Sequence, residues 1–319
     1  MVRVAIVGAG HMVNVIHCPS LRSLEDVQIA AICDLDAGRL NATADKFGIE
    51  RRYADYRRMI EDTAPDAVYV IGPPDVMYPH WVWCLEHGLN LFIEKPMGLT
   101  MHQARMLAYL AEKNDCMTQV GFQRRACPLA VALRNECLKR GAITHAMCRF
   151  YKNIARPLLD ARDHMMDEGV HCIDTLRWMC GGEVKAIHSV ATRVRMPDIN
   201  LILAILEFDS GAVGVLSGNW YSGRRIFDIE MHAPGICAEA DLEGKGYLYA
   251  DNDTQGIEFD TRTVAGSDEL YVHGGFRAKH REFIDCLKSG KQPGSGFADA
   301  VKTMDVAERI LAASLLEGR

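Results

Sequence analysis

Val2-Arg3-Val4-Ala5-Ile6-Val7-Gly8-Ala9-Gly10 opens the chain with a short apolar segment that leads directly into a glycine turn. The β-branched residues predict a buried strand over Val2–Val7. Gly8 and Gly10 permit a tight turn and the close approach of a pyrophosphate to the amides at a helix N-terminus. Val13 stands where Gly-x-Gly-x-x-Gly has its third glycine, so the turn is a weak signal of dinucleotide binding by itself.

The segment after the turn predicts a helix from about Gly10 toward Leu24. Pro19 should kink or interrupt this helix, because proline cannot donate the helical hydrogen bond. His11 and Met12 directly follow the turn, and we count both among the expected cofactor contacts.

A second predicted strand, Val27–Cys33, ends in Asp34, which is where an acidic residue takes the ribose hydroxyls of a dinucleotide. This carboxylate would repel a 2′-phosphate and therefore favours NAD over NADP. Arg39 lies close enough along the next helix to reach a phosphate, so NADP is not excluded. The alternative is that Asp34 only caps the helix expected over Leu35–Phe47.

Buried strands continue to alternate with amphipathic helices up to about residue 121, which predicts a doubly wound parallel sheet, a Rossmann domain over residues 1–121. Gly72-Pro73-Pro74 and Glu94-Lys95-Pro96 each follow a strand of this pattern. Both turns should therefore lie at the same carboxyl edge as Gly8, where open α/β sheets bind ligands. For Lys95 the alternative is an ordinary lysine that ends a strand and points to water.

Residues 122–319 have a different pattern, which predicts an α+β domain with a large, mostly antiparallel sheet. A helix beginning near Met166 carries Asp167, His171, Asp174 and Trp178 on one face. Two carboxylates about one turn from an imidazole can orient and tune it for acid/base chemistry. The alternative is a histidine that is simply packed or solvated.

The composition restricts the class of protein. The chain has 319 residues, 49% hydrophobic and 24% charged, with a net charge of -6 and a pI near 6.1. This balance gives no general attraction to nucleic acid or to an anionic membrane, so a small-molecule partner is expected. The eleven cysteines lack Cys-x-x-Cys spacing, which favours reduced thiols. With no signal peptide or membrane-spanning pattern, we expect a cytoplasmic protein.

Taken together, these motifs resemble the Gfo/Idh/MocA family of glucose-fructose oxidoreductases and inositol dehydrogenases. The resemblance covers nearly the whole chain and includes the following segments in addition to Gly8-Ala9-Gly10 and Asp34: Pro73, Cys84-Leu85-Glu86-His87-Gly88, Glu94-Lys95-Pro96, Gly121-Phe122-Gln123-Arg124-Arg125 and Asp167-x-x-x-His171-x-x-Asp174. It implies an NAD(P)-dependent oxidoreductase acting on a hydroxyl or carbonyl carbon of a sugar, polyol or sugar acid. Lys95 and His171 would flank the substrate carbon, with Asp167 close by.

The resemblance also implies cofactor contacts at Gly72, Pro73, Met77, Glu94, Lys95 and Gln123. The chain departs from the family at Met77, where a histidine is common, and His80 follows one turn later. It departs again before Asp167, where charged and bulky residues replace glycines. We name as possible substrate contacts Lys95, Arg125, Tyr151, Arg156, Arg162, His164, Asp167 and His171. Arg156, Arg162 and His164 would suit an acidic or phosphorylated group, or form a solvated loop.

Two other functions remain open at this point. One is an enzyme of the same fold that cleaves glycosides and keeps its NAD, and the other is a sugar- or NAD-sensing protein without turnover. A metal site at His164, Asp167 and His171 has suitable spacing, but hydride transfer to a nicotinamide does not require one, so we assign no metal. The large sheet is also expected to join copies of the chain into a dimer or tetramer.

Overall fold

The computed structural model describes residues 1–154, 158 and 163–317. By internal contacts the chain forms two compact units. The first contains Met1–Phe122, Leu270–Val272 and Phe276–Val301, and the second contains Gln123–Glu269, His273–Gly275 and the residues from Lys302 onward. The first boundary between the units thus lies near residue 121. The chain crosses between the units again later, because Leu270–Val272 and Phe276–Val301 belong to the first unit.

The first unit is built on a parallel sheet that has six strands in the described part of the chain, in the order β3-β2-β1-β4-β5-β6. The strands are β1 (Val2–Val7), β2 (Val27–Cys33), β3 (Arg52–Tyr53), β4 (Ala67–Val70), β5 (Leu91–Ile93) and β6 (Thr118–Val120). The order reverses beside β1, which is the position where doubly wound folds bind ligands. The predicted Rossmann fold is confirmed.

Helices connect these strands, and their ends follow from local sequence. They are α1 (Cys18–Arg22), α2 (Ala37–Phe47), α3 (Tyr56–Thr63), α4 (Pro74–Glu86) and α5 (Met101–Lys113), joined by α10 (Phe276–Ser289) from late in the chain. The Asp36 side chain caps α2 by accepting a hydrogen bond from Arg39 N, and Gly48 ends it with a φ of 61°. Asp55 caps α3 in the same way.

The first helical segment contains an irregularity that the sequence pattern did not indicate. The stretch η1 (Val13–His17) is a π-helix, and α1 continues directly from it with Pro19 in its first turn. Pro19 therefore neither ends nor breaks the helix, because the wider π turn lies just before it, and proline is tolerated in the first turn of an α-helix. The irregularity places His17 in the protein interior, fully buried.

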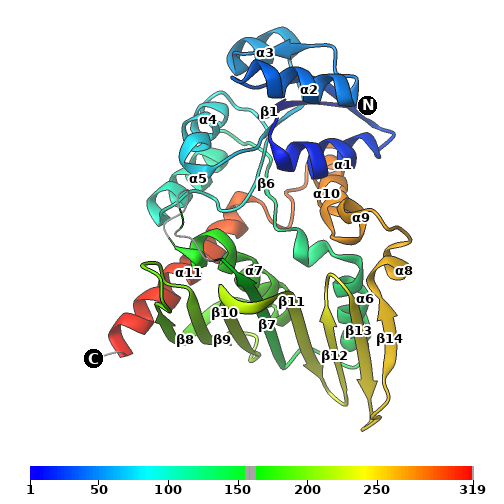
Figure 1. Ribbon diagram of the computed structural model, residues 1–319, viewed down its shortest axis with the longest axis vertical. Coiled ribbons are helices and arrows are strands. Elements are labelled where there is room, and N and C mark those ends of the chain that lie inside the picture. The colour runs from blue at the N-terminus through cyan, green and yellow to red at the C-terminus, as the bar shows by residue number, and fades with distance from the viewer. Residues whose placement is uncertain (155–157, 159–162, 318–319) are drawn as a thin grey trace. The chain divides into compact units, whose positions relative to one another are not determined.

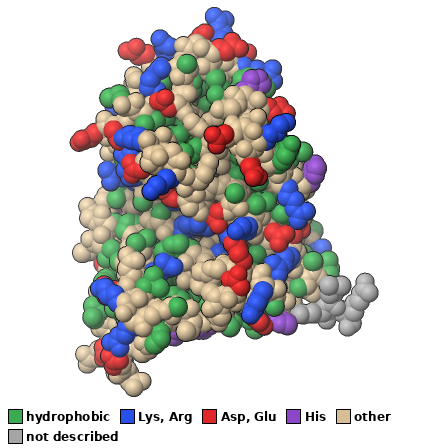
Figure 2. Space-filling model, turned by 180° about the vertical axis from the view of Figure 1, so that it is seen from behind, with side chains coloured by type: hydrophobic (Ala, Val, Ile, Leu, Met, Phe, Trp, Pro, Cys, Tyr) green, Lys and Arg blue, Asp and Glu red, His purple; other side chains and the backbone are tan. Residues whose placement is uncertain are grey.

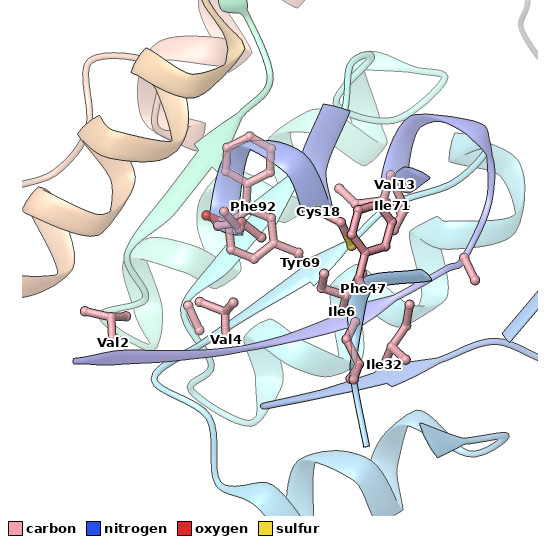
Figure 3. Packing of buried hydrophobic residues seen from close by; sticks show 14 of the residues in the cluster. Val2, Val4, Ile6, Val13, Cys18, Ile32, Phe47, Tyr69, Ile71 and Phe92 are labelled. Carbon is pink, nitrogen blue, oxygen red and sulfur yellow. The ribbon is translucent and has the colours of Figure 1, made fainter. Parts of the chain in front are cut away.

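The core of the first unit lies between the sheet and the helices on one of its faces. Figure 3 shows Val4 and Ile6 of β1 with Ile32, Tyr69 and Phe92 from neighbouring strands, packed beneath Val13 and Cys18 of the first helical segment. In Figure 1, α1 and α10 lie side by side, and ion pairs from Arg281 and Lys288 to Asp26 join α10 to the loop after α1. A segment more than 250 residues away in the sequence thus completes the core.

The second unit is built on a sheet that has eight strands in the described part of the chain, in the order β14-β13-β12-β11-β7-β10-β9-β8. The strands are β7 (His145–Asn153), β8 (Val184–Thr192), β9 (Leu201–Phe208), β10 (Val213–Asn219), β11 (Tyr221–Ala233), β12 (Ile236–Asp241), β13 (Lys245–Ala250) and β14 (Ile257–Asp260). Only β7 and β10 pair in parallel in this described sheet. The predicted, mostly antiparallel sheet is confirmed.

Helices α6 (Pro128–Leu138) and α7 (Val170–Cys180) pack against one face of this sheet (Figure 1). The remaining helical segments are η2 (Gln123–Ala126), η3 (Met165–Gly169), α8 (Thr261–Ala265), α9 (Leu270–His273) and α11 (Phe297–Glu317). Residues of β9 alternate in exposure, so Ile202, Ala204 and Leu206 are buried against the helices while Leu203 and Ile205 lie on the opposite face.

The surface and the thiols agree with the composition. All eleven cysteines lie among the described residues and are free, nine of them buried. The face in Figure 2 carries lysine and arginine mixed with aspartate and glutamate rather than a continuous basic patch. None of the helices in the described ranges has the length and apolar character needed to span a membrane.

Candidate functional site

The first unit contains a pocket of about 550 Å³ at the carboxyl edge of its sheet. The pocket is lined by residues that follow β1, β2, β3 and β4, together with the first turns of α4. These residues are Val7, Gly8, Gly10, His11, Cys33, Asp34, Leu35, Arg39, Ala54, Tyr56, Ile71, Gly72, Pro73, Val76, Met77 and His80. Of the predicted cofactor contacts, Gly8, Gly10, His11, Asp34, Gly72, Pro73 and Met77 are therefore brought together.

Glycines shape the edge of this pocket. Gly8 has a φ of +102°, and a Cβ there would overlap the carbonyl oxygen of Ile71, so no other residue fits. A Cβ at Gly10 would meet no atom within 4 Å, which leaves its backbone open to the pocket. At Gly72 the space is taken by the side chain of Met77, which packs over the glycine. The turns thus leave main-chain surface exposed where a phosphate could approach.

Asp34 is held at the end of β2 with its carboxylate directed at the glycine turn. One oxygen accepts a hydrogen bond from Ala9 N at 2.8 Å, and the other accepts from Asp36 N at 2.8 Å and Arg39 Nη2 at 3.0 Å. Burial raises the pKa of Asp34, but these hydrogen bonds outweigh it, and the pKa is lowered overall. The carboxylate is thus ionised at neutral pH, and the helix cap is Asp36, not Asp34.

Two aromatic side chains also line the pocket, and the sequence pattern did not indicate that they pair. Tyr56 at the start of α3 and His80 on α4 lie with ring centroids 4.7 Å apart. Burial lowers the pKa of His80, so its ring is neutral at neutral pH and offers a flat, uncharged surface. The missed signal is the edge strand β3, whose two residues are too few for a periodic pattern to reveal.

Four predicted cofactor contacts are not among the residues that line this pocket. Met12 packs, half-buried, against the hydrophobic core. Glu94 and Lys95 follow β5, with Lys95 half-buried and its peptide bond to Pro96 cis. Gln123 is buried and belongs to the second unit.

In the second unit, Asp167 and His171 lie on either side of the junction between the π-helical segment η3 and α7. Asp163 begins this segment, because its Oδ1 accepts a hydrogen bond from Met166 N at 2.8 Å. The His171 ring lies among aromatic residues, with its centroid 6.5 Å from those of Phe150 and Phe227. Helix α7 is buried almost all round, so the face that carries His171 and Asp174 is enclosed as well as the apolar face.

Arg125, a predicted substrate contact, is paired with Asp174. Its Nε donates to Asp174 Oδ2 at 2.8 Å and its Nη2 donates to Oδ1. The side chain of Asp174 is 1% exposed and that of Arg125 is 12% exposed. The carboxylate three residues after His171 is thus neutralised by a guanidinium.

His164 is fully buried and stacks on Trp220, with centroids 5.1 Å apart and planes 14° apart. Burial lowers the pKa of His164, against the opposing effect of Glu168 and its other acidic neighbours. Its complete burial contradicts the solvated-loop alternative for His164, whereas its contact with an acidic or phosphorylated group stays a prediction. Arg156 and Arg162 lie outside the described residues.

Tyr151 lies on the face of the sheet opposite to His171. Phe150 and Tyr151 are consecutive on β7, and consecutive strand residues point to opposite faces. Phe150 is buried beside His171, whereas the Tyr151 hydroxyl is 2.9 Å from Ser217 Oγ. The expected approach of Tyr151 to the site around His171 is therefore not found.

Among the described residues, no three histidine, cysteine, aspartate or glutamate side chains are grouped as metal ligands would be. His164, Asp167 and His171, which have ligand-like spacing in the sequence, do not form such a group in the structure.

Comparisons with known proteins agree with this architecture. Residues 2–122 match the oxidoreductase family with an NAD-binding Rossmann fold, Gfo/Idh/MocA, and residues 141–233 match the C-terminal domain of the same family. The chain is 26% identical over 310 residues to the myo-inositol 2-dehydrogenase of Thermotoga maritima, covering 91% of this chain and 90% of that protein.

Two solved structures share the fold. A dehydrogenase from Chromobacterium violaceum has a TM-score of 0.90 at 22% identity, covering 100% of this chain and 96% of that one. An oxidoreductase from Agrobacterium radiobacter, in complex with NAD+, L-tartaric acid and magnesium, has a TM-score of 0.84 at 20% identity, covering 100% and 97%. With both family domains matched, the chain belongs to the Gfo/Idh/MocA family of oxidoreductases, and its first domain is an NAD-binding Rossmann fold.

Proposed function

We propose that this chain is an NAD-dependent dehydrogenase or reductase that exchanges a hydride between the nicotinamide and a hydroxyl-bearing or carbonyl carbon of a sugar, polyol or sugar acid. The observation that carries the proposal is the pocket at the strand edge, where Asp34 and the Gly8 turn are hydrogen-bonded together. The substrate class is supported by the relative from Thermotoga maritima, which is named for a polyol.

The pocket residues fit the cofactor. The open backbone at Gly10 suits a pyrophosphate, and the ionised Asp34 suits ribose hydroxyls and disfavours a 2′-phosphate. The paired rings of Tyr56 and His80 offer a flat surface for an adenine. We also propose Glu94 and Gln123 as cofactor contacts, although neither of them lines this pocket.

Lys95, His171 and Asp167 are proposed as the groups that handle the proton. The bound nicotinamide accepts or returns the hydride, and the former hydroxyl proton must move to a base. An imidazole can take that proton, which is the role of His171. The Lys95 ammonium would stabilise negative charge developing on the substrate oxygen, and Asp167 would orient the imidazole.

A panel of sugars, inositols and sugar acids, each assayed in both directions with NAD and with NADP, tests this proposal. We expect hydride exchange with at least one compound and faster turnover with NAD. Exchange with none of them by a chain that binds NAD would contradict the proposed reaction. Release of a sugar from a glycoside without net change in the cofactor would replace it with the glycoside-cleaving alternative.

We also propose that two or more copies associate through the face of the large sheet that is turned away from α6 and α7. Val190, Leu203 and Ile205 are 59%, 46% and 47% exposed and lie on the adjacent strands β8 and β9. Light scattering should detect a dimer or tetramer, and Leu203→Glu should dissociate it. Ile257 on edge strand β14 is also exposed and apolar, but it pairs with the buried Leu248 and so does not belong to this face. Ile257→Glu should therefore leave the assembly intact. A monomer at assay concentration would contradict this proposal.

A further inference from the structure

A row of four polar side chains, three buried and one partly buried, crosses the core of the first unit and ends beside the proposed catalytic turn. His17 Nε2 lies 3.3 Å from Glu94 Oε1, and His17 Nδ1 lies 3.3 Å from His280 Nε2. His280 Nδ1 in turn lies 3.3 Å from the Tyr69 hydroxyl. These residues come from η1, the end of β5, α10 and β4, and Glu94 directly precedes Lys95.

The side chains are almost completely enclosed. Tyr69 and His17 are 0% exposed and His280 is 1% exposed. Among the described residues, neither His17 Nε2 nor Glu94 Oε1 has a hydrogen-bond partner, although both atoms are buried and lie only 3.3 Å apart. Buried polar atoms without partners are costly, so these two atoms are best explained as partners of each other.

The row has one order of protons when the His17 ring carries a single proton. A carboxylate only accepts hydrogen bonds, so His17 Nε2 must carry a proton to pair with Glu94. A neutral imidazole has one donor and one acceptor, so His17 Nδ1 accepts from His280 Nε2–H. His280 Nδ1 then accepts from the Tyr69 hydroxyl. Burial lowers the pKa of His280 well below its usual value and raises that of Tyr69, so both groups are neutral, as this order requires.

Packing restrains this row of side chains at both of its ends. His280 stacks on Phe92 at 5.0 Å, and Tyr69 stacks on Phe92 at 4.7 Å, the pair visible side by side in Figure 3. At the other end, a Cβ on Gly121 would lie 2.7 Å from Glu94 Oε1, so the Glu94 carboxylate occupies the space that this glycine leaves. The carboxylate is therefore confined between His17 and the Gly121 backbone.

We propose that His17 is a positioning residue, which holds Glu94 and hence the turn to Lys95 in the conformation that binds the cofactor. The Glu94 carboxylate sets the tautomer of His17, and His280 and Tyr69 complete the row of contacts behind it. The inference rests on the proposed function in one respect, namely that Glu94 contributes to the cofactor site. α10, a late segment of the chain, thereby serves the site as well as the core.

Nitrogen NMR of the cofactor-free protein tests the proton order without reference to activity. We expect His17 and His280 both to be neutral with the proton on Nε2. Glu94→Met removes the acceptor that sets this order and should give mixed tautomers at both rings. Tyr69→Phe leaves that acceptor in place and should change neither. A charged ring, or a proton on Nδ1 of either ring in the unaltered protein, would overturn the assignment.

Calorimetric NAD binding tests the positioning role. His17→Leu should weaken binding about tenfold or more, the usual effect of losing a hydrogen bond to a charged group. His17→Gln, whose amide can donate from near the Nε2 position, should restore most of the affinity. Ser20→Ala is the matched control, because Ser20 is equally buried in the same helical segment and its hydroxyl has no partner among the described residues.

A second variant perturbs Glu94 from its other side. Gly121→Ala should also weaken NAD binding, since the new methyl group meets the carboxylate, whereas Gly223→Ala, which meets no atom within 4 Å, should not. Unchanged NAD affinity in folded His17→Leu or Gly121→Ala would overturn the positioning role. If the unaltered protein bound no NAD, the proposed function would fail while the NMR result would still decide the proton order.

Discussion

Arg125 donates two hydrogen bonds to the buried carboxylate of Asp174, one of them from Nε to Oδ2 at 2.8 Å. A paired and desolvated guanidinium of this kind stabilises the helix that carries His171, because an unpaired buried carboxylate would be costly. The position of Arg125 after Gly121-Phe122-Gln123 suggested a substrate contact, whereas the structure shows a pairing within the second unit.

Arg125→Ala should therefore lower the free energy of unfolding by about 3–5 kcal/mol, the usual cost of removing one partner of a buried ion pair. Urea denaturation measures this effect. Arg58→Ala, at a site where the side chain is 76% exposed, should change it by no more than about 0.5 kcal/mol. If Arg125→Ala instead kept full stability and only raised KM, the substrate role would be correct.

Asp34→Ala should weaken NAD binding about tenfold and improve NADP binding, because the variant removes the carboxylate and releases Arg39 from its 3.0 Å contact. Titration with both cofactors measures the preference. The double variant Asp34→Ala/Arg39→Ala should lose the gain in NADP affinity. Tighter binding of NADP than NAD by the unaltered protein would contradict the role given to Asp34.

His164 should make the protein sensitive to acid. Burial lowers the pKa of its ring below the ordinary value of 6.5, so the unfolded chain binds the proton more readily than the folded one. The stability contribution is complete above pH 6.5 and is lost as the pH falls toward the lower, folded pKa. His164→Asn should therefore flatten the fall in melting temperature below pH 6.5, whereas exposed His102→Asn should not. Equal slopes for His164→Asn and the unaltered protein would contradict this account.

The sequence was sufficient wherever local pattern determines structure. β1 and β2 have the predicted bounds, because runs rich in β-branched residues end at turn-forming residues. Gly8 and Asp34 lie in one pocket as predicted, since the strand edge follows from the alternation of strands and helices. The short strand β3 and the edge strand β14 were missed, because two to four residues carry too little periodicity.

Tertiary pairings were beyond the reach of the pattern. His17 and His280 are 263 residues apart, and nothing in either local segment indicates that their rings meet. The helical segments η1 and η3 are π-helical, with more residues per turn than an α-helix. Their side chains therefore point in directions that ideal α-helical spacing does not predict. The pairing of Arg125 with Asp174 was missed for the same reason, although each residue had been singled out separately.

The most direct test of the central claim is NAD reduction by Lys95→Met, measured together with NAD affinity. The account predicts that turnover is abolished, because the ammonium that stabilises the substrate oxygen is gone, while the dissociation constant for NAD stays within a few fold of the unaltered value. Lys113→Met, at an exposed helix end, serves as the control and should turn over normally. Substantial residual turnover in Lys95→Met would remove Lys95 from the mechanism and contradict the account.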